Sequence, residues 1–136
     1  MAMGVIATDK NKITLYYNSE NNIGKKCYAY VQASDKKVLG IDVSKTTVTG
    51  TQWAELAEKL KIPIEKLIDV QHPDFKNEFG SNGIDLEQED WLKIINKNPK
   101  LFQFPILIYG NSYHQLKTGA DFKKYLESES AGIKKR

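Results

Sequence analysis

The feature that most constrains the fold of this chain is a change of hydrophobic period near its start. Over Lys12–Tyr17 polar and apolar residues alternate, which is the pattern of a β-strand. After the polar stretch "NSENN", apolar residues recur every three or four positions, which predicts a helix over about Asn22–Ala33. The residues on its apolar face are Ile23, Cys27, Tyr30 and Val31. A strand that leads through a short loop into a helix is typical of an α/β fold.

The remainder of the chain continues this alternation of strands and helices. The predicted elements are a strand at Val38–Val43, a helix after the capping-box pattern Thr49-x-x-Gln52, a short helix at Ile64–Val70 after Pro63, a helix closed by Pro99, two strands joined by a tight turn at Gly110-Asn111, and a last helix at Asp121–Ser128. The order β-α-β-α-α-α-β-β-α predicts an α/β domain with a mixed sheet.

Length and cysteine content favour one cytoplasmic domain. The 136 residues fit a single core, with a flexible lead-in at 1–11, the folded domain at 12–128 and a basic tail at 129–136. The longest apolar run, Phe104–Tyr109, is too short to span a bilayer, and the first residues lack the pattern of a signal peptide. The single cysteine permits no intramolecular disulfide. We therefore expect no membrane partner.

The charge of the chain does not indicate nucleic-acid binding. The formal net charge is +3, and among the 20 basic residues the only arginine is Arg136. Arginine is the preferred residue for bidentate contacts to phosphate and guanine, and the lysines here are interleaved with acids. This composition predicts a solvated lysine-rich surface and no specific nucleic-acid binding.

The order of elements and three motifs resemble the arsenate reductase/Spx family of thioredoxin-fold proteins. The motifs are the first strand with its loop, "TGTQWAEL", and the block "EDWLKIINKNPKLFQFPILIYG". The resemblance covers about Lys12 to Ser128. It implies a thioredoxin-like domain with a mixed four-stranded sheet flanked by helices and a helical insertion between the second and third strands.

The resemblance also implies where an active site would lie, and the residues there depart from the family pattern. Against the family motif Y-x-x-P-x-C, the proline falls at Ser19, the nucleophilic cysteine at Asn21, the second cysteine at Gly24 and the following arginine at Lys25. The family's oxyanion-binding arginines map to Asp69, Phe104 and Gln115, and its cis-proline to Pro105. Because nucleophile and arginines are both missing, we expect no arsenate reduction.

The function that these departures favour is binding without catalysis. The first hypothesis is a catalytically silent module that binds an unidentified protein partner, a peptide or a small anion and needs no cofactor. The expected groove is lined by Tyr17, Asn18, Asn21, Asn22, Lys25, Phe104, Pro105 and Tyr113.

Two alternatives remain open. Cys27 could serve a monothiol, glutaredoxin-like oxidoreductase that exchanges with glutathione, although its place on the apolar face of the helix favours a buried structural thiol. The resemblance to Spx also permits a transcriptional regulator that binds RNA polymerase. Enzymatic activity is thus undecided, and its absence is favoured.

The other candidate residues favour structural roles. His72, in the predicted turn "QHPDF", and His114, in the last hairpin, lack neighbours at metal-ligand spacing, so no metal site is expected. Four acids stand at the start of the predicted fourth helix, where its dipole favours them: Asp85, Glu87, Glu89 and Asp90. Trp53 and Trp91 lie on helical apolar stripes and are expected in the core.

Overall fold

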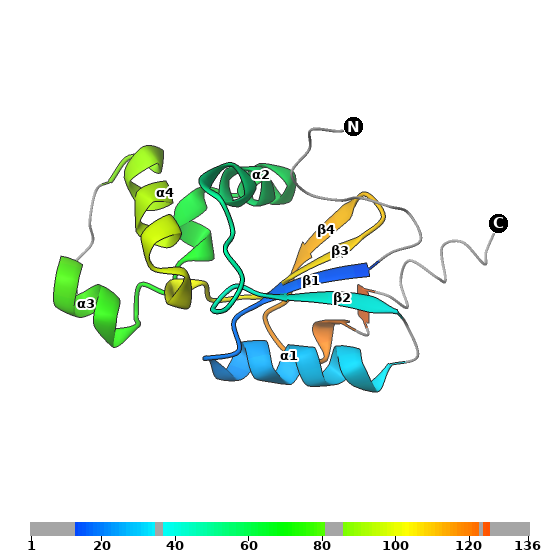
Figure 1. Cartoon of the computed structure of the whole chain (residues 1–136). Helices are drawn as coiled ribbons and strands as arrows, with labels where there is room; N and C mark the ends of the chain where they lie inside the picture. The colour runs from blue at the N-terminus through cyan, green and yellow to red at the C-terminus, as the bar shows by residue number, and fades with distance from the viewer. Residues whose placement is uncertain (1–12, 35–36, 81–85, 123, 126–136) are drawn as a thin grey trace.

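The computed structural model describes residues 13–34, 37–80, 86–122 and 124–125 (Figure 1). The strands are β1 (Ile13–Tyr17), β2 (Val38–Asp42), β3 (Ile106–Tyr109) and β4 (Ser112–Gln115). The α-helices are α1 (Asn22–Ala33), α2 (Gly50–Leu60), α3 (Pro73–Phe79) and α4 (Gln88–Lys97), and two 3₁₀ helices are η1 (Ile64–Leu67) and η2 (Pro99–Leu101). The predicted lead-in and basic tail lie outside the described residues.

The four strands form one mixed sheet, as predicted. The strand order is β2-β1-β3-β4, with β1 parallel to β2 and the other neighbours antiparallel. The helices α2, α3 and α4 all lie between β2 and β3 in the chain, as expected for the helical insertion. No helix in the described part of the chain is long and apolar enough to cross a membrane.

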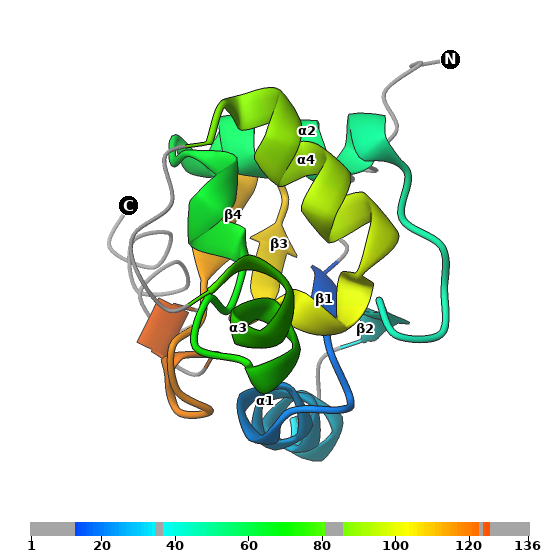
Figure 2. The same cartoon turned by 90° about the vertical axis from the view of Figure 1, so that its left-hand side faces the viewer.

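Both faces of the sheet are covered by helices. Figure 1 shows α1 along one face and α2 with α4 on the other side, and Figure 2 shows the sheet between these two layers. Ile13 and Leu15 of β1 pack in the cluster under α1, whereas Tyr16 packs in the cluster under α2. Thr14 is also buried, because α2 and its neighbours cover the face that simple alternation would leave to solvent.

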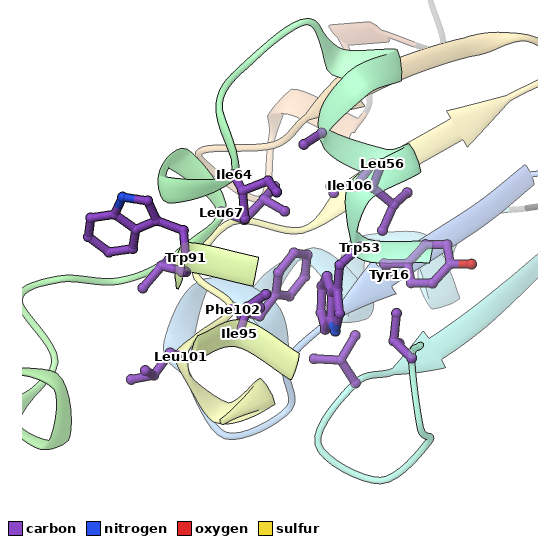
Figure 3. Packing of buried hydrophobic residues seen from close by; sticks show 14 of the residues in the cluster. Tyr16, Trp53, Leu56, Ile64, Leu67, Trp91, Ile95, Leu101, Phe102 and Ile106 are labelled. Carbon is purple, nitrogen blue, oxygen red and sulfur yellow. The ribbon is translucent and has the colours of Figure 1, made fainter. Parts of the chain in front are cut away.

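The larger core lies between the sheet and the helical insertion (Figure 3). Trp53 of α2 and Phe102, which follows η2, are both fully buried, with ring centroids 5.2 Å apart. Trp91 of α4 is buried as well and stacks with Phe75 of α3 at 5.8 Å. The prediction that both tryptophans are core residues is confirmed.

Several helix boundaries follow from capping residues that are visible in the sequence. The capping box before α2 is present, since Gln52 N donates to Thr49 Oγ1 at 3.2 Å and Thr49 N donates to Gln52 Oε1 at 3.0 Å. Glu87 and Asp90 form a second capping box at the start of α4, which confirms that these two acids stabilise the start of the helix. Asp85 lies outside the described residues.

One predicted helix and one predicted turn need correction. The segment predicted as a helix at Ile64–Val70 is a 3₁₀ helix that ends at Leu67, because Ile68 turns out to pair with Phe102 in an antiparallel bridge. The segment after His72 is α3 rather than a turn. Pro73 occupies its first turn, and His72 Nδ1 accepts a hydrogen bond from Asp74 N at 3.0 Å. Of the predicted last helix, residues 121, 122, 124 and 125 are helical and most of the rest is outside the described range.

Candidate functional site

The candidate site lies where β1 runs into α1 and where the chain between η2 and β3 passes beside that junction. Asn21 is the N-cap of α1, and its Oδ1 accepts a hydrogen bond from Gly24 N at 2.6 Å. Its Nδ2 donates to the carbonyl oxygens of Phe102 and Gln103, each at 3.1 Å. The side chain at the expected nucleophile position is therefore a neutral amide whose oxygen and nitrogen are both engaged.

Asn18 is part of the same junction, but it does not line a groove. It is 1% exposed, its Nδ2 donates to Lys100 O at 2.8 Å and to Phe102 O at 3.2 Å, and its Oδ1 accepts from Glu20 N at 2.9 Å. The expectation of Asn18 as a groove residue is wrong, because the approach of the η2 segment buries it.

Gly24, which maps to the family's second cysteine, is held tightly against the β1–α1 loop. A Cβ atom built on Gly24 would overlap the carbonyl oxygen of Asn18. Any side chain at this position would force the start of α1 away from β1. The neighbouring Lys25 and Asn22 are exposed.

The chain segment before β3 brings most of the predicted positions together. Asp69 N donates to Leu101 O at 2.8 Å, and Gln103 N donates to Leu67 O at 3.0 Å, so the end of η1 lies beside this segment. Gln115 of β4 reaches the same place, since its Nε2 donates to Lys66 O at 3.2 Å. Asn21 and Asp69 thus bond to the backbone of residues 101–103, and Gln115 bonds to the adjoining η1.

The Phe104–Pro105 peptide bond is trans, so the expectation of a cis bond is wrong. None of the described peptide bonds is cis. Trans is the intrinsically favoured form of an X–Pro bond, by about 0.5–1 kcal/mol. Hydrogen bonds hold the segment on both sides of this bond, since Asn21 Nδ2 donates to the carbonyls of Phe102 and Gln103 and Leu116 N donates to Pro105 O at 2.8 Å.

Tyr17 and Tyr113 do not flank a common groove. Tyr17 packs in the cluster under α1 and stacks on Tyr28, with ring centroids 4.4 Å apart, and burial raises its pKa to about 12. Tyr113 packs against the cluster under α2, where burial and the nearby Glu55 raise its pKa. The two tyrosines lie on opposite faces of the sheet, so the predicted pairing of these residues across one groove is wrong.

Sequence reasoning missed Lys117, which supplies a cation at this site. Its Nζ lies 5.6 Å from the centroid of the half-buried Phe104 ring, within the range of a cation–π contact. Lys117 is exposed and forms no ion pair with a described residue. The exposed part of the site thus combines an aromatic ring, a lysine and the start of α1. No sequence pattern connects a lysine after β4 with the residue before Pro105.

Asp42, at the end of β2, is a second residue that sequence reasoning missed. Its Oδ1 accepts from Ser19 N at 3.2 Å, Ser44 N at 3.1 Å and Ser44 Oγ at 2.7 Å. Burial alone would raise the pKa of this carboxyl, but the hydrogen bonds from the two serines outweigh it and the pKa is lowered. Asp42 therefore ties the β1–α1 loop, including Ser19, to β2. An Asp two residues before a Ser after a strand is a turn signal that could have pointed to it.

Cys27 is a buried thiol on the face of α1 that packs against the sheet. It is 0% exposed, and its Sγ lies 3.5 Å from Thr118 O, to which it donates. Burial, with a smaller contribution from Asp121, raises the pKa of the thiol to about 11. A thiol with these properties is poorly suited to attack a disulfide.

A polar hollow lies next to the site on the other side of Lys100. It has a volume of about 380 Å³ and is lined by Asp74, Asn77, Glu78, Asn98, Lys100 and Leu101. Lys100 Nζ and Asp74 Oδ2 are 2.6 Å apart, and this ion pair joins η2 to α3. Its effect is to lower the pKa of Asp74 and to raise that of Lys100. Within the described residues, no group of three or more His, Cys, Asp or Glu could hold a metal ion.

Structural comparison relates the whole domain to solved arsenate reductases. The arsenate reductase from Vibrio cholerae superposes with a TM-score of 0.70 at 12% identity, over 83% of this chain and 96% of that chain. A putative arsenate reductase from Yersinia pestis gives 0.69 at 18% identity, over 82% and 98%. An ArsC-related protein from Brucella melitensis gives 0.62 at 14% identity, over 85% and 94%. The fold is that of the arsenate reductases.

The likeness to the arsenate reductases is one of fold. At 12–18% identity it carries no activity over to this chain. No family model and no curated protein matches the sequence. The predicted thioredoxin-like, arsenate-reductase-type architecture is therefore confirmed, and the function has to be argued from the site.

Proposed function

We propose that this chain is a catalytically silent protein of the arsenate-reductase-like thioredoxin fold that acts by binding a partner protein. The observation that carries the proposal is the state of Asn21. Its amide caps α1 and binds two backbone carbonyls at the position where the resemblance would put the nucleophile. An amide cannot form a mixed disulfide or an arsenate adduct, so the residue stabilises the junction instead of reacting there.

The surface that remains for a partner is smaller than the groove predicted from the sequence. We define the partner surface as Asn22, Lys25, Phe104 and Lys117, which are exposed or half-buried and lie at the start of α1 and before and after the β3–β4 hairpin. Aromatic rings are enriched at protein interfaces, and here the Phe104 ring lies in cation–π range of the exposed Lys117.

The monothiol alternative has less support. It requires an accessible thiolate, whereas Cys27 is fully buried and the pKa of its thiol is raised. The Spx-like alternative is a special case of the proposal, with RNA polymerase as the partner, and the experiment below tests it directly.

The test is quantitative affinity capture with the tagged chain. The variants Phe104→Ala and Lys117→Glu alter the partner surface, and Lys59→Glu on the exposed side of α2 is the matched charge control. We expect a specific partner to be retained by the wild type and by Lys59→Glu and to be depleted roughly tenfold by the other two variants. Recovery of RNA polymerase subunits in that pattern would identify the Spx-like case.

A parallel turnover assay checks catalytic silence. The wild-type chain with glutathione and arsenate, or with a model disulfide, should give no more turnover than Cys27→Ser. Turnover that depends on Cys27, or a partner captured equally by all variants, would contradict the proposal.

A further inference from the structure

The strand β2 forms an unprotected edge of the sheet. It pairs with β1 on one side and with no described strand on the other, and Figure 2 shows it at the end of the sheet beyond β1. A strand edge presents unpaired N–H and C=O groups that can pair with another chain, and proteins usually protect it with lysine, proline or a bulge. The five-residue strand "VLGID" contains none of these three, its one charged residue is Asp42 at the end, and its second residue, Leu39, is 55% exposed.

In the opposite edge strand, β4, two side chains contact other parts of the chain. All four of its residues are half-buried. The side chain of Gln115 is bonded to Lys66 O, and His114 stacks on Tyr125 with ring centroids 4.1 Å apart. The two edges therefore differ, and β2 is the one at which a further strand could be added.

The pairing register with β1 fixes which way the side chains of β2 point. Val38, Gly40 and Asp42 pair with β1 residues that include Ile13 and Leu15, so they lie on the α1 face. Leu39 and Ile41 lie on the other face, where Ile41 packs against the larger core and Leu39 does not.

We infer that β2 pairs with β2 of a second copy of this chain, antiparallel, about a two-fold axis at Gly40. In this register Leu39 of each copy lies opposite Ile41 of the other. These two side chains form one apolar contact on each side of the axis, and the contact covers the exposed Leu39. Val38 lies opposite Asp42 of the second copy, so no like charges face each other. The side chains of β2 are thus complementary to those of a second, antiparallel β2.

Gly40 suits the position on the axis. The ring of Tyr28 lies over it on the α1 face, with Cε1 only 2.7 Å from the place of a Cβ atom, so a side chain there would have to displace this ring. The axis would bring the half-buried Tyr28 rings of the two copies next to each other above the paired strands. A strand of five residues buries less area than a standard interface, so we expect a dimer that dissociates on dilution.

The first test is sedimentation velocity on the full chain from low-micromolar to near-millimolar concentration. The wild type should shift from the monomer mass of 15.5 kDa towards twice that mass. Leu39→Lys should stay monomeric, whereas Val70→Lys, which changes another exposed aliphatic residue away from β2, should dimerise like the wild type. A wild type that is monomeric throughout, or a Leu39→Lys variant that dimerises equally, would overturn the inference.

The second test checks the register by disulfide formation. Leu39→Cys and Ile41→Cys chains are mixed in equal amounts under mild oxidation, with circular dichroism used to confirm that each is folded. The native Cys27 is fully buried and should not react. The mixture should form a covalent dimer several-fold faster than either variant alone, because positions 39 and 41 face each other only between copies. Equal rates in all three samples would exclude this register.

Discussion

At the scale of single residues, Asn21 links the start of α1 to the segment that leads into β3. Its Oδ1 accepts a hydrogen bond from the first turn of the helix, and its Nδ2 donates to the carbonyl oxygens of Phe102 and Gln103. The Nδ2 of Asn18, in the same loop, donates to the carbonyl oxygens of Lys100 and Phe102. A junction that could carry a reactive group is thus held together by two neutral amides.

The first prediction concerns Asn21. Asn21→Ala should lower the free energy of unfolding by about 3 kcal/mol, because it removes an N-cap and two partly buried hydrogen bonds. Asn21→Ser keeps the cap and should lose roughly half as much. Urea denaturation measures both, with the exposed Asn22→Ala as a control expected within about 0.5 kcal/mol of the wild type. Equal stability of Asn21→Ala and Asn22→Ala would show that the amide does not hold the junction.

At the scale of elements, Asp42 joins the end of β2 to the β1–α1 loop through hydrogen bonds from Ser19 and Ser44. The pKa of its carboxyl is lowered in the folded state, so the charged form stabilises the fold. This contribution is fully present above the unfolded pKa of 3.8 and is lost as the pH falls through the lower folded value.

The second prediction follows from that pH dependence. Asp42→Asn should be about 2 kcal/mol less stable than the wild type near neutral pH, since it weakens hydrogen bonds to a charged group. The difference should shrink progressively below pH 3.8. Glu58→Gln, at an exposed carboxylate on α2, is the matched control for the Asp-to-Asn type of change. A difference for Asp42→Asn that stays constant with pH would contradict the role given to its charge.

Local signals predicted some elements fully and others only in part. The bounds of α1 and the capping box of α2 were predictable, because an N-cap and an apolar stripe act within a few residues. The helix α3 was missed because "QHPDF" also fits a turn, and what favours the helix is the stacking of Phe75 on Trp91, a contact distant in sequence. Only the bridge between Ile68 and Phe102 explains the early end of η1.

At the scale of the whole molecule, the arrangement of the sheet determines which candidate residues lie close together. Asn21 and Asp69 bond to the backbone of residues 101–103 and Gln115 to the adjoining η1, because these chain segments pack together. Tyr17 and Tyr113 separate because the register across β1, β3 and β4 sets them on opposite faces. Local patterns do not determine this register, because it depends on contacts between distant segments. The cis Phe104–Pro105 bond was expected only from the family resemblance, and the bond has the intrinsically favoured trans form.

The central claim is that this arsenate-reductase-like fold keeps the junction of a redox site but has no reactive thiol there. The most direct test is the rate at which a chromogenic disulfide reagent modifies Cys27, the one cysteine of the chain, in the native and the unfolded protein. With a pKa raised from 9.0 to about 11 and a fully buried sulfur, native Cys27 should react at least roughly a hundredfold more slowly at neutral pH than unfolded Cys27. A native rate equal to or above the unfolded rate near neutral pH would mean an activated thiolate and would contradict the account.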